Sequence, residues 1–325
     1  MNMKKSVYHH TLFGIITIFA ILASICSCSS ESSKAKQTQQ VSGNLRNENL
    51  CRQLDSLVVN TPGVVGVAIV SDNDTITVNN DITYAMMSVF KMHQALAVAN
   101  QLERTGRNLD DSLRISAAEL DRDTWSPMLK HYGNNGDFAI TIGQLMRYAV
   151  ISSDNNASNL LFSHIVTPLE TDSFIRSIAP DTTFRILYSE TEMKQNHDLS
   201  YRNHSSPLSA ALLIRKIFNE PVVSPAMQDS IKAYLSEVTT GADRLGSVVS
   251  DADSLFFAHK TGSGYRNERG ELMAHNDVGY FCMPDGRDYA IAVLIRDFNG
   301  SEQEASAIIA KISRLVYDHF HTLLL

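Results

Sequence analysis

The sequence lacks a block of basic residues, a framework of cysteines and a long hydrophobic run. Lys and Arg number 28 against 35 Asp and Glu, so the formal net charge is -7. Phosphate binding requires clustered Lys and Arg, so we expect no nucleic-acid partner. With 44% hydrophobic and 19% charged residues, the composition is typical of a globular protein rather than of a disordered or membrane-spanning chain.

The longest apolar run lies at the amino terminus and is too short to cross a bilayer. It covers residues 12–25, and at about 1.5 Å per helical residue it falls short of a hydrocarbon core of about 30 Å. Two lysines precede it and small residues follow, as in a signal peptide over residues 1–28. We therefore expect export to the periplasm. Either the leader is cleaved near Ser27, or Cys28 carries a lipid anchor and the polar segment 29–45 is a tether.

Cysteine and metal ligands are sparse in the rest of the chain. Outside the leader, cysteine occurs only at Cys51 and Cys282, which cannot form a disulfide scaffold. They could pair in an oxidising compartment, or remain buried thiols. His259 and His275 lie close in sequence to the segment 260–264, but a metal site needs several converging ligands and none can be assembled here, so we expect no metal and no other cofactor.

Strand-like and helix-like patterns form three blocks along the chain. A helix and a hairpin come first, a mostly helical block follows, and strands return before a closing amphipathic helix. The expected strands cover 64–70, 75–78, 255–259, 278–283 and 289–295, and the expected helices cover 49–59, 89–102, 142–162, 207–218, 223–238 and 302–320.

Strands at both ends of the chain around a helical middle predict an α+β fold. The simplest packing is one antiparallel sheet built from both chain ends, with flanking helices and an all-α subdomain beside it. We place the folded domain at 46–325, with an α/β part at about 46–84 and 240–325 and a helical part at about 85–239. A crevice between the two parts is the expected site.

The segment Met87-Ser-Val-Phe-Lys91 places Ser88 and Lys91 three residues apart at the start of an apolar helix. Residues at this spacing share a helix face, so the hydroxyl and the amine can touch. A helix amino terminus also offers partial positive charge and unpaired N–H groups, which favour an anionic nucleophile and an oxyanion hole. Alone the pattern is weak, because Ser33 and Lys36 repeat it in the polar tether.

Ser153-Asp154-Asn155 interrupts a helical region with turn-forming residues between apolar flanks. It would lie in a short loop on a buried wall. A simple turn is the alternative, because the same triplet occurs at residues 71–73 inside the expected hairpin. Only the copy at Ser153 follows Ser88 and lies in the helical part, so we favour this copy as part of a site.

A third segment, His259-Lys-Thr-Gly-Ser-Gly264, places Lys260 on a strand or at its end. Glycines in a strand allow the close approach of a ligand or another backbone. A substrate amide could pair with the strand edge while Lys260 and Thr261 meet a carboxylate. The alternative is a strand that ends in a glycine-rich turn.

These three segments occur in the order found in class A β-lactamases and penicillin-binding proteins. The residues of the three segments resemble those of the cephalosporinase branch of class A, which includes extended-spectrum members. The resemblance extends from about Leu50 to the end of the chain. It implies the β-lactamase/transpeptidase-like fold, a β-lactam substrate, antibiotic resistance and an acyl-serine on Ser88. We expect a monomer. The rival interpretations are a penicillin-binding peptidase that stays acylated and a non-hydrolytic β-lactam sensor domain.

The resemblance also implies a role for each matched residue. Ser153 would pass a proton to the lactam nitrogen, and Asn155 would bind the amide of the substrate side chain. The substrate carboxylate would be bound by Lys260 and Thr261, and the oxyanion by the backbone N–H groups of Ser88 and Ser263.

Hydrolysis of the acyl-serine requires a carboxylate that holds a water against the ester. Residues 188–193 resemble the family's Ω-loop, in which Glu190 matches the general base and Glu192 is the alternative. Tyr188 stands where an Arg is common, and Lys194 stands where an Asn is usual. The salt bridge of the loop and the second anchor of the water are therefore in question.

Two further residues match the family. Trp125 corresponds to an aromatic residue at the mouth of the site, although a single Trp is as readily part of a core. Arg244 resembles the carboxylate-binding Arg of some class A enzymes, since the other familiar position for that Arg holds Asn276 here. A surface salt bridge is the alternative role for Arg244.

The proton of Ser88 could pass through water to Glu190, or directly to Lys91. Freeing the amine of a lysine with an ordinary pKa near 10.4 costs roughly 4.6 kcal/mol at neutral pH, whereas a glutamate is already ionised. The route to Glu190 is therefore favoured, unless strong desolvation of Lys91 reverses the order.

Overall fold

The computed structural model describes residues 47–72, 74–134, 136–249 and 255–321. The expected signal peptide and the tether lie outside these residues, so export to the periplasm and a lipid anchor at Cys28 stay predictions of the sequence. None of the helices in the described ranges has both the length and the apolar character needed to span a membrane.

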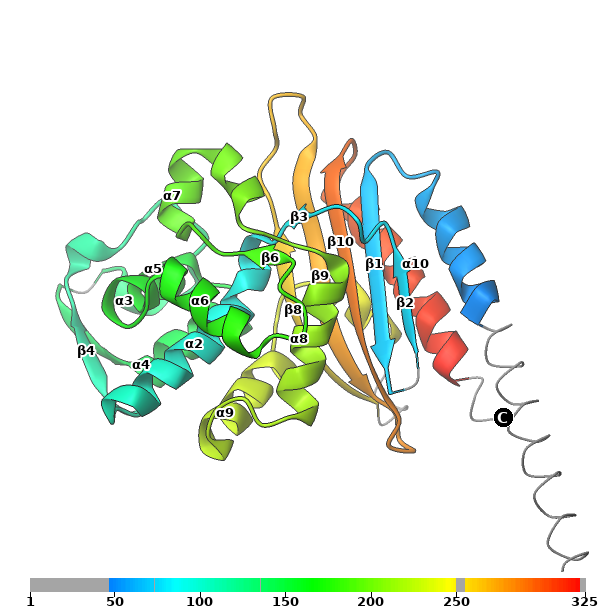
Figure 1. The fold of residues 1–325 in the computed structure, drawn as a ribbon. Helices are drawn as coiled ribbons and strands as arrows, with labels where there is room; N and C mark the ends of the chain where they lie inside the picture. Colours follow the sequence, from blue (N-terminus) through cyan, green and yellow to red (C-terminus); the bar gives the residue numbers. More distant parts are fainter. Residues whose placement is uncertain (1–46, 73, 135, 250–254, 322–325) are drawn as a thin grey trace, which may run out of the picture. The chain divides into compact units, whose positions relative to one another are not determined.

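One five-stranded sheet contains strands from both ends of the chain, and the predicted α+β fold is confirmed (Figure 1). Neighbouring strands are antiparallel in the order β2-β1-β10-β9-β8. The early strand β1 pairs with the late strand β10, with Val64 opposite Arg296 and Ser71 opposite Tyr289. The strands are β1 (Val64–Ser71), β2 (Thr75–Val78), β8 (Phe256–Ser263), β9 (Leu272–Cys282) and β10 (Asp288–Phe298).

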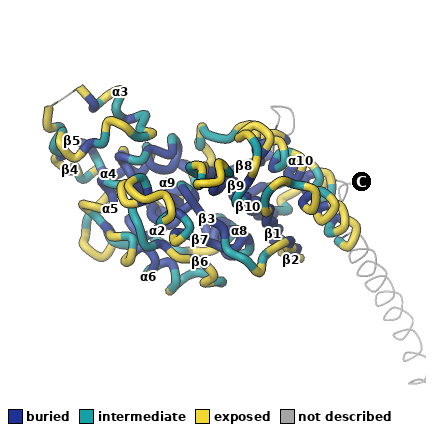
Figure 2. Tube along the Cα trace, turned by 90° about the horizontal axis from the view of Figure 1, so that it is seen from above, coloured by how far each residue is buried: buried dark blue, intermediate teal, exposed yellow. Residues whose placement is uncertain are grey.

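Both faces of this sheet are buried, which explains why its central strands are almost continuously apolar. Successive side chains of a strand point to opposite faces. On β10, Tyr289, Ile291 and Val293 pack with α10 (Glu302–His321) and with the helical residues 50–58. The alternate residues, including Ala290 and Ala292, pack with α8 (Pro207–Asn219) and the helical part. Figure 2 colours the chain by burial and shows buried segments in α2 and along the strands of the sheet.

Helix α2 (Phe90–Thr105) is the central helix of the helical part. It is buried along most of its length, as expected for a helix whose apolar residues do not keep to one stripe. It ends at Gly106, whose φ of 68° is the left-handed conformation that closes many helices. The helices α4, α5, α6 and α9 surround it. Their bounds are Ile142–Ile151, Asn155–His164, Pro168–Ile178 and Pro225–Ser236.

The structure adds elements that the sequence patterns did not predict. Helix α6 is one of them, and two small antiparallel sheets lie in the helical part. Strands of two to four residues are too short to show a readable alternation. The small strands are β3 (Tyr84–Ala85), β4 (Ser112–Ile115), β5 (Phe138–Thr141), β6 (Phe184–Arg185) and β7 (His204–Ser205), and the short helices are η1 (Met87–Val89), η2 (Ala117–Glu119), α3 (Leu129–Tyr132), α7 (Glu190–Gln195), η3 (His197–Arg202) and η4 (Leu245–Val248).

Strands β8 and β9 are longer than predicted because buried polar residues continue them. Beyond His259, β8 runs on through Lys260 to Ser263, and β9 begins at Leu272 rather than at 278. His259 and Asp277 satisfy each other, with Nδ1 and Oδ1 2.9 Å apart. A polar residue with a buried partner interrupts the apolar pattern without interrupting the strand.

The two cysteines of the described chain, Cys51 and Cys282, are partly buried and are not joined to each other. Of the two arrangements open to them from the sequence, the structure shows thiols rather than a pair. Burial raises the pKa of the Cys282 thiol.

Candidate active site

Ser88 lies where η1 runs directly into α2. Lys91 follows one turn later and is fully buried, with its Nζ 2.9 Å from Ser88 Oγ. The residue before Ser88, Met87, has a φ of 46°, which is unfavourable for a side chain other than glycine. The predicted contact between hydroxyl and amine is therefore present, on a turn whose backbone conformation is costly.

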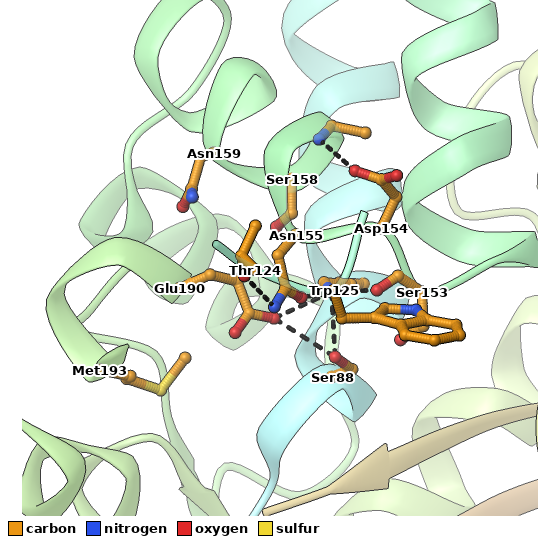
Figure 3. Close-up of polar contacts among 12 residues, drawn as sticks. Ser88, Thr124, Trp125, Ser153, Asp154, Asn155, Ser158, Asn159, Glu190 and Met193 are labelled. Carbon is orange, nitrogen blue, oxygen red and sulfur yellow. Dashed lines mark hydrogen bonds and ion pairs between the residues drawn. The ribbon is translucent and has the colours of Figure 1, made fainter. Parts of the chain in front are cut away.

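Four oxygen atoms surround the Nζ of Lys91. Besides Ser88 Oγ they are Glu190 Oε1 at 2.9 Å, Asn155 Oδ1 at 2.7 Å and the Ser153 carbonyl oxygen at 2.8 Å. An ammonium group donates and cannot accept, so this set of acceptors suits the charged form of Lys91. Figure 3 shows Glu190 and Asn155 pointing from different segments toward Ser88.

Glu190 is the first residue of α7, and its side chain is only 4% exposed. Its Oε1 lies 3.2 Å from Ser88 Oγ, so the two groups are in direct hydrogen-bond reach. Glu192 has a different position: its Oε2 accepts a 2.8 Å hydrogen bond from the backbone N–H of Ser189 and caps its own helix. Of the two candidate carboxylates, the structure brings Glu190 to the serine.

Ser153 lies in the short loop between α4 and α5, with a φ of 55°. The neighbouring Asp154 holds this loop, since its buried carboxylate accepts hydrogen bonds from the backbone N–H groups of Ala157 at 2.9 Å and Met128 at 2.8 Å. Burial raises the pKa of Asp154. On the side of the sheet, Ser153 Oγ accepts a 3.0 Å hydrogen bond from Lys260. The loop that carries Ser153 is therefore held by the contacts of Asp154 on one side and by Lys260 of the sheet on the other.

Lys260 is fully buried within β8 and also donates to the carbonyl oxygen of Thr261 at 3.0 Å. Burial, together with the nearby charge of Lys91, holds the pKa of the Lys260 ammonium well below its usual value. A Cβ at Gly262 would overlap the carbonyl oxygen of Met86. The glycine therefore allows β8 to approach the turn that carries the serine.

Arg244 is buried, and the alternative of a surface salt bridge is wrong. Its guanidinium donates to Ser263 Oγ at 2.7 Å and to the carbonyl oxygen of Asn276 at 2.8 Å. Burial lowers the pKa of Arg244. The side chain of Asn276 instead donates to the carbonyl oxygen of Ala85 at 2.8 Å, which ties β9 to the segment before Ser88.

Trp125 is 61% exposed, so it belongs to the surface rather than to a core. Its Nε1 donates to the carbonyl oxygen of Ser152 at 2.9 Å. In Figure 3 its indole lies beside the loop that carries Ser153. It lines a cleft of about 500 Å³. The predicted residues that share this cleft are Ser88, Ser153, Asn155, Glu190, Arg244, Thr261 and Ser263.

Several residues of the cleft and its supports were missed by the sequence interpretation. Asp123, Tyr265 and Glu302 line the cleft. Asn203 holds the segment before α7, accepting from the N–H of Leu187 at 2.8 Å and donating to the carbonyl oxygen of Tyr188 at 2.7 Å. These contacts join positions far apart in the chain, so local spacing carried no signal of them.

The arrangement defines an acyl-transfer enzyme with a serine nucleophile. A hydroxyl contacts both a carboxylate and an ammonium, which is the signature of an activated nucleophile. The Arg244 guanidinium lines the same cleft, and a second ammonium, on Lys260, is buried behind the cleft residue Ser153. The site therefore suits an anionic acyl substrate.

Comparison with known proteins identifies the family. The model of the beta-lactamase enzyme family matches residues 49–320. A β-lactamase of Phocaeicola vulgatus is 45% identical over 269 residues, which are 82% of this chain and 84% of that protein. The extended-spectrum β-lactamase PER-1 of Pseudomonas aeruginosa is 31% identical over 82% of this chain and 86% of its own length. A solved class A β-lactamase from Bacteroides cellulosilyticus has a TM-score of 0.80 at 28% identity, covering 85% of this chain and 99% of that one.

The chain belongs to the β-lactamase enzyme family, and within it to the class A serine enzymes.

Proposed function

We propose that this protein hydrolyses β-lactam antibiotics through an acyl-serine intermediate on Ser88 and so confers resistance. The observation that carries this proposal is the pair of contacts at Ser88 Oγ, to Lys91 Nζ at 2.9 Å and to Glu190 Oε1 at 3.2 Å. As Oγ attacks the lactam carbonyl, Glu190 can accept its proton without an intervening atom. The backbone N–H groups of Ser88 and Ser263 hold the oxyanion, and one such donor typically contributes about 2.7–4 kcal/mol to transition-state stabilisation.

Ring opening then requires a proton for the lactam nitrogen. When the carbon–nitrogen bond breaks, Ser153 Oγ donates its proton to that nitrogen, and the Lys260 ammonium 3.0 Å away can replace it. The substrate carboxylate binds between Lys260, Thr261 and Ser263, with Arg244 behind Ser263. Asn155 binds the side-chain amide of the substrate, while Trp125 covers the mouth of the cleft.

Deacylation depends on Glu190. Exchange with solvent first removes the proton that Glu190 took from Ser88 and returns one to Lys260. A water then attacks the acyl ester while giving a proton to the Glu190 carboxylate, and the bond between the acyl carbon and Ser88 Oγ breaks as Glu190 passes that proton to Oγ.

When the Glu190 carboxylate is removed, Lys91 loses its anionic partner beside the ammonium of Lys260, which favours the neutral amine of Lys91. That amine can then accept the proton of Ser88 in acylation, whereas the structure brings no second carboxylate to Ser88 among the described residues to activate the water. Loss of the Glu190 carboxylate should therefore affect deacylation more than acylation.

The test is Glu190→Gln. We expect deacylation to slow by about 10²–10⁴-fold, the usual contribution of a general base, so that the acyl-enzyme accumulates and is detected by mass spectrometry. Glu192→Gln is the matched control and should keep steady turnover. Unchanged steady turnover of Glu190→Gln would show that another group is the base. A single stoichiometric burst of nitrocefin by the unaltered protein would instead identify a peptidase or a sensor domain.

Cephalosporins, including extended-spectrum compounds, are the proposed preferred substrates. The name of the similar enzyme PER-1 describes an extended spectrum, and the three motif segments resemble the cephalosporinase branch. Ranking kcat/KM over penicillins, cephalosporins and carbapenems tests this preference, which a penicillin in first place would contradict.

A further inference from the structure

Lys194 links the helix of Glu190 to a loop on the other side of the cleft. It lies four residues after Glu190 on α7 and lines the cleft. Its Nζ is 2.7 Å from Asp121 Oδ2 and 3.4 Å from Asp123 Oδ2, and it also donates to the carbonyl oxygen of Asp123. Because Asp121 is 73 residues away in the chain, this contact joins two segments that are distant in sequence.

The link closes a ring of contacts around the reacting groups. Next to Asp123, Thr124 Oγ1 accepts a 3.0 Å hydrogen bond from Asn155 Nδ2. The Oδ1 of Asn155 binds Lys91 at 2.7 Å, and Lys91 pairs with Glu190 at 2.9 Å. Lys194 connects α7 back to the segment of Thr124. Glu190 is therefore held by its own contact with Lys91 and, through α7, by the contacts of Lys194.

Helix α7 has too few residues to hold Glu190 in place by itself. It spans six residues, and isolated helices shorter than about 12 residues are marginal in water. Its other polar attachments include the capping box of Ser189, a 3.3 Å hydrogen bond from the N–H of Thr191 to Asn159 Oδ1, and a 3.5 Å contact between Asn203 Nδ2 and Met193 Sδ. The ion pair between Lys194 and Asp121 connects this helix to the segment that carries Trp125.

Lys194 is poorly suited to activate the water itself. An ammonium group has no acceptor, so it cannot receive a proton or a hydrogen bond from water as a side-chain amide oxygen can. Its hydrogen bond to Asp121 raises the pKa of Lys194 and lowers that of Asp121, so both stay charged at neutral pH.

We propose that the ion pair between Lys194 and Asp121 is a positioning device that keeps Glu190 against the acylated serine during deacylation. The proposal rests on the proposed role of Glu190 as general base. Acylation depends on it less, because it needs only the direct contact between Ser88 Oγ and Glu190 Oε1, whereas deacylation must align Glu190, a water and the ester. The two side chains are 32% and 31% exposed, so salt should weaken the device.

The experiment is a double-mutant cycle with Lys194→Met, Asp121→Asn and the combined variant, followed by stopped-flow and quenched mass spectrometry with nitrocefin. We expect each single variant to slow deacylation by about 10-fold, since small misplacements of a catalytic group have large effects. Acylation should change by less than about 3-fold, so kcat and KM fall together while kcat/KM holds. The combined variant should be no slower than either single one, as for residues that act through one contact.

Two further variants serve as controls. Lys194→Arg preserves the ion pair and should keep deacylation within about 2-fold of the unaltered protein. Arg287→Met breaks a matched pair with Asp285, in which both side chains are 33% exposed, at the opposite end of the sheet in the turn between β9 and β10. It should leave both rates unchanged. If Lys194→Met does not fold, as a thermal melt would reveal, Asp121→Asn and Lys194→Arg carry the test.

Four results would overturn the proposal. Normal deacylation in Asp121→Asn with slow deacylation in Lys194→Met would mean that Lys194 acts alone. Additive effects in the combined variant would mean that the two residues act separately. An equal loss in acylation would mean general distortion of the site. Normal deacylation in both single variants, while Glu190→Gln stays acylated, overturns only the positioning device, whereas normal turnover of Glu190→Gln overturns the proposed function.

Discussion

Two buried ammonium groups lie on either side of one serine. Lys91 donates to the carbonyl oxygen of Ser153 at 2.8 Å, and Lys260 donates to Ser153 Oγ at 3.0 Å. Like charges in a buried site disfavour each other's charged form, and Glu190 offsets this repulsion by pairing with Lys91. The substrate carboxylate would supply the missing anion beside Lys260, which gives the site a preference for anionic substrates.

The lowered pKa of Lys260 predicts an alkaline limit to substrate capture. Below that pKa the ammonium binds the carboxylate, and above it the neutral amine does not. We expect kcat/KM for nitrocefin to fall by about 10-fold or more as pH rises toward the ordinary lysine value near 10.4, because a hydrogen bond to a charged partner is lost. Lys260→Arg should move this limb to higher pH, since a guanidinium keeps its proton.

Loss of the Lys260 proton would not lower kcat/KM by unfolding the protein. A lysine with a lowered pKa in the folded state binds fewer protons than in the unfolded chain, so its contribution to stability increases as pH rises between the two pKa values. Circular dichroism over the same pH range is the control. If kcat/KM of Lys260→Arg falls at the same alkaline pH as in the unaltered protein, another group is responsible for the titration.

At the scale of elements, the site depends on how closely β8 approaches η1. Gly262 faces the carbonyl oxygen of Met86, and the side chain of Val89 lies on the same side. The close packing brings Lys260 and Ser88 to one cleft. It also supports the costly backbone of Met87, because a strained turn persists where its surroundings hold it.

Gly262→Ala should therefore lower both stability and activity. We expect the free energy of unfolding to fall by about 1–3 kcal/mol, as for other overpacked sites, with a larger loss in acylation than stability alone explains. Chemical denaturation and nitrocefin kinetics measure the two effects. Gly136→Ala is the matched control, because a Cβ at Gly136 meets nothing within 4 Å and its φ is not in the left-handed region. A Gly262→Ala variant as active as Gly136→Ala would show that the approach of the strand is not critical.

At the scale of the whole folded unit, the sheet separates two hydrophobic layers. One layer lies under α10 and the helical residues 50–58, and the other joins the sheet to α8 and the helical part. The helices that carry Lys91 and Glu190 pack in the second layer, whereas Arg244 and Glu302 adjoin η4 and α10 of the first layer. The first layer supports the sheet from the far face, so changes there should act on stability and leave the chemistry intact.

Ile309→Ala on α10 tests this separation. Ile309 is fully buried in the first layer, so we expect a loss of about 2–5 kcal/mol in the free energy of unfolding, with kcat and KM unchanged below the melting transition. The neighbouring Ile308 is only partly buried, and Ile308→Ala should cost less. Thermal melts and nitrocefin kinetics at low temperature provide both numbers. An altered kcat in Ile309→Ala would mean that the two layers are coupled.

Local patterns of the sequence predicted much of this molecule. The spacing of Ser88 and Lys91 predicted their contact because residues three apart share a helix face, and the structure shows it at 2.9 Å. The apolar runs at both chain ends predicted one antiparallel sheet, which is confirmed. The small strands and α6 were missed, since short or mixed segments show no clear period.

Only the tertiary structure decided matters that depend on distant partners. Glu190 and Glu192 are two residues apart, but the start of α7 turns one toward Ser88 and uses the other as a cap. Arg244 was open to two roles until folding buried it against Ser263. Lys194 looked like the loss of a family residue, and the fold pairs it with Asp121. Local spacing determines what a helix or strand presents on each face, whereas the partner of that face depends on how the rest of the chain folds.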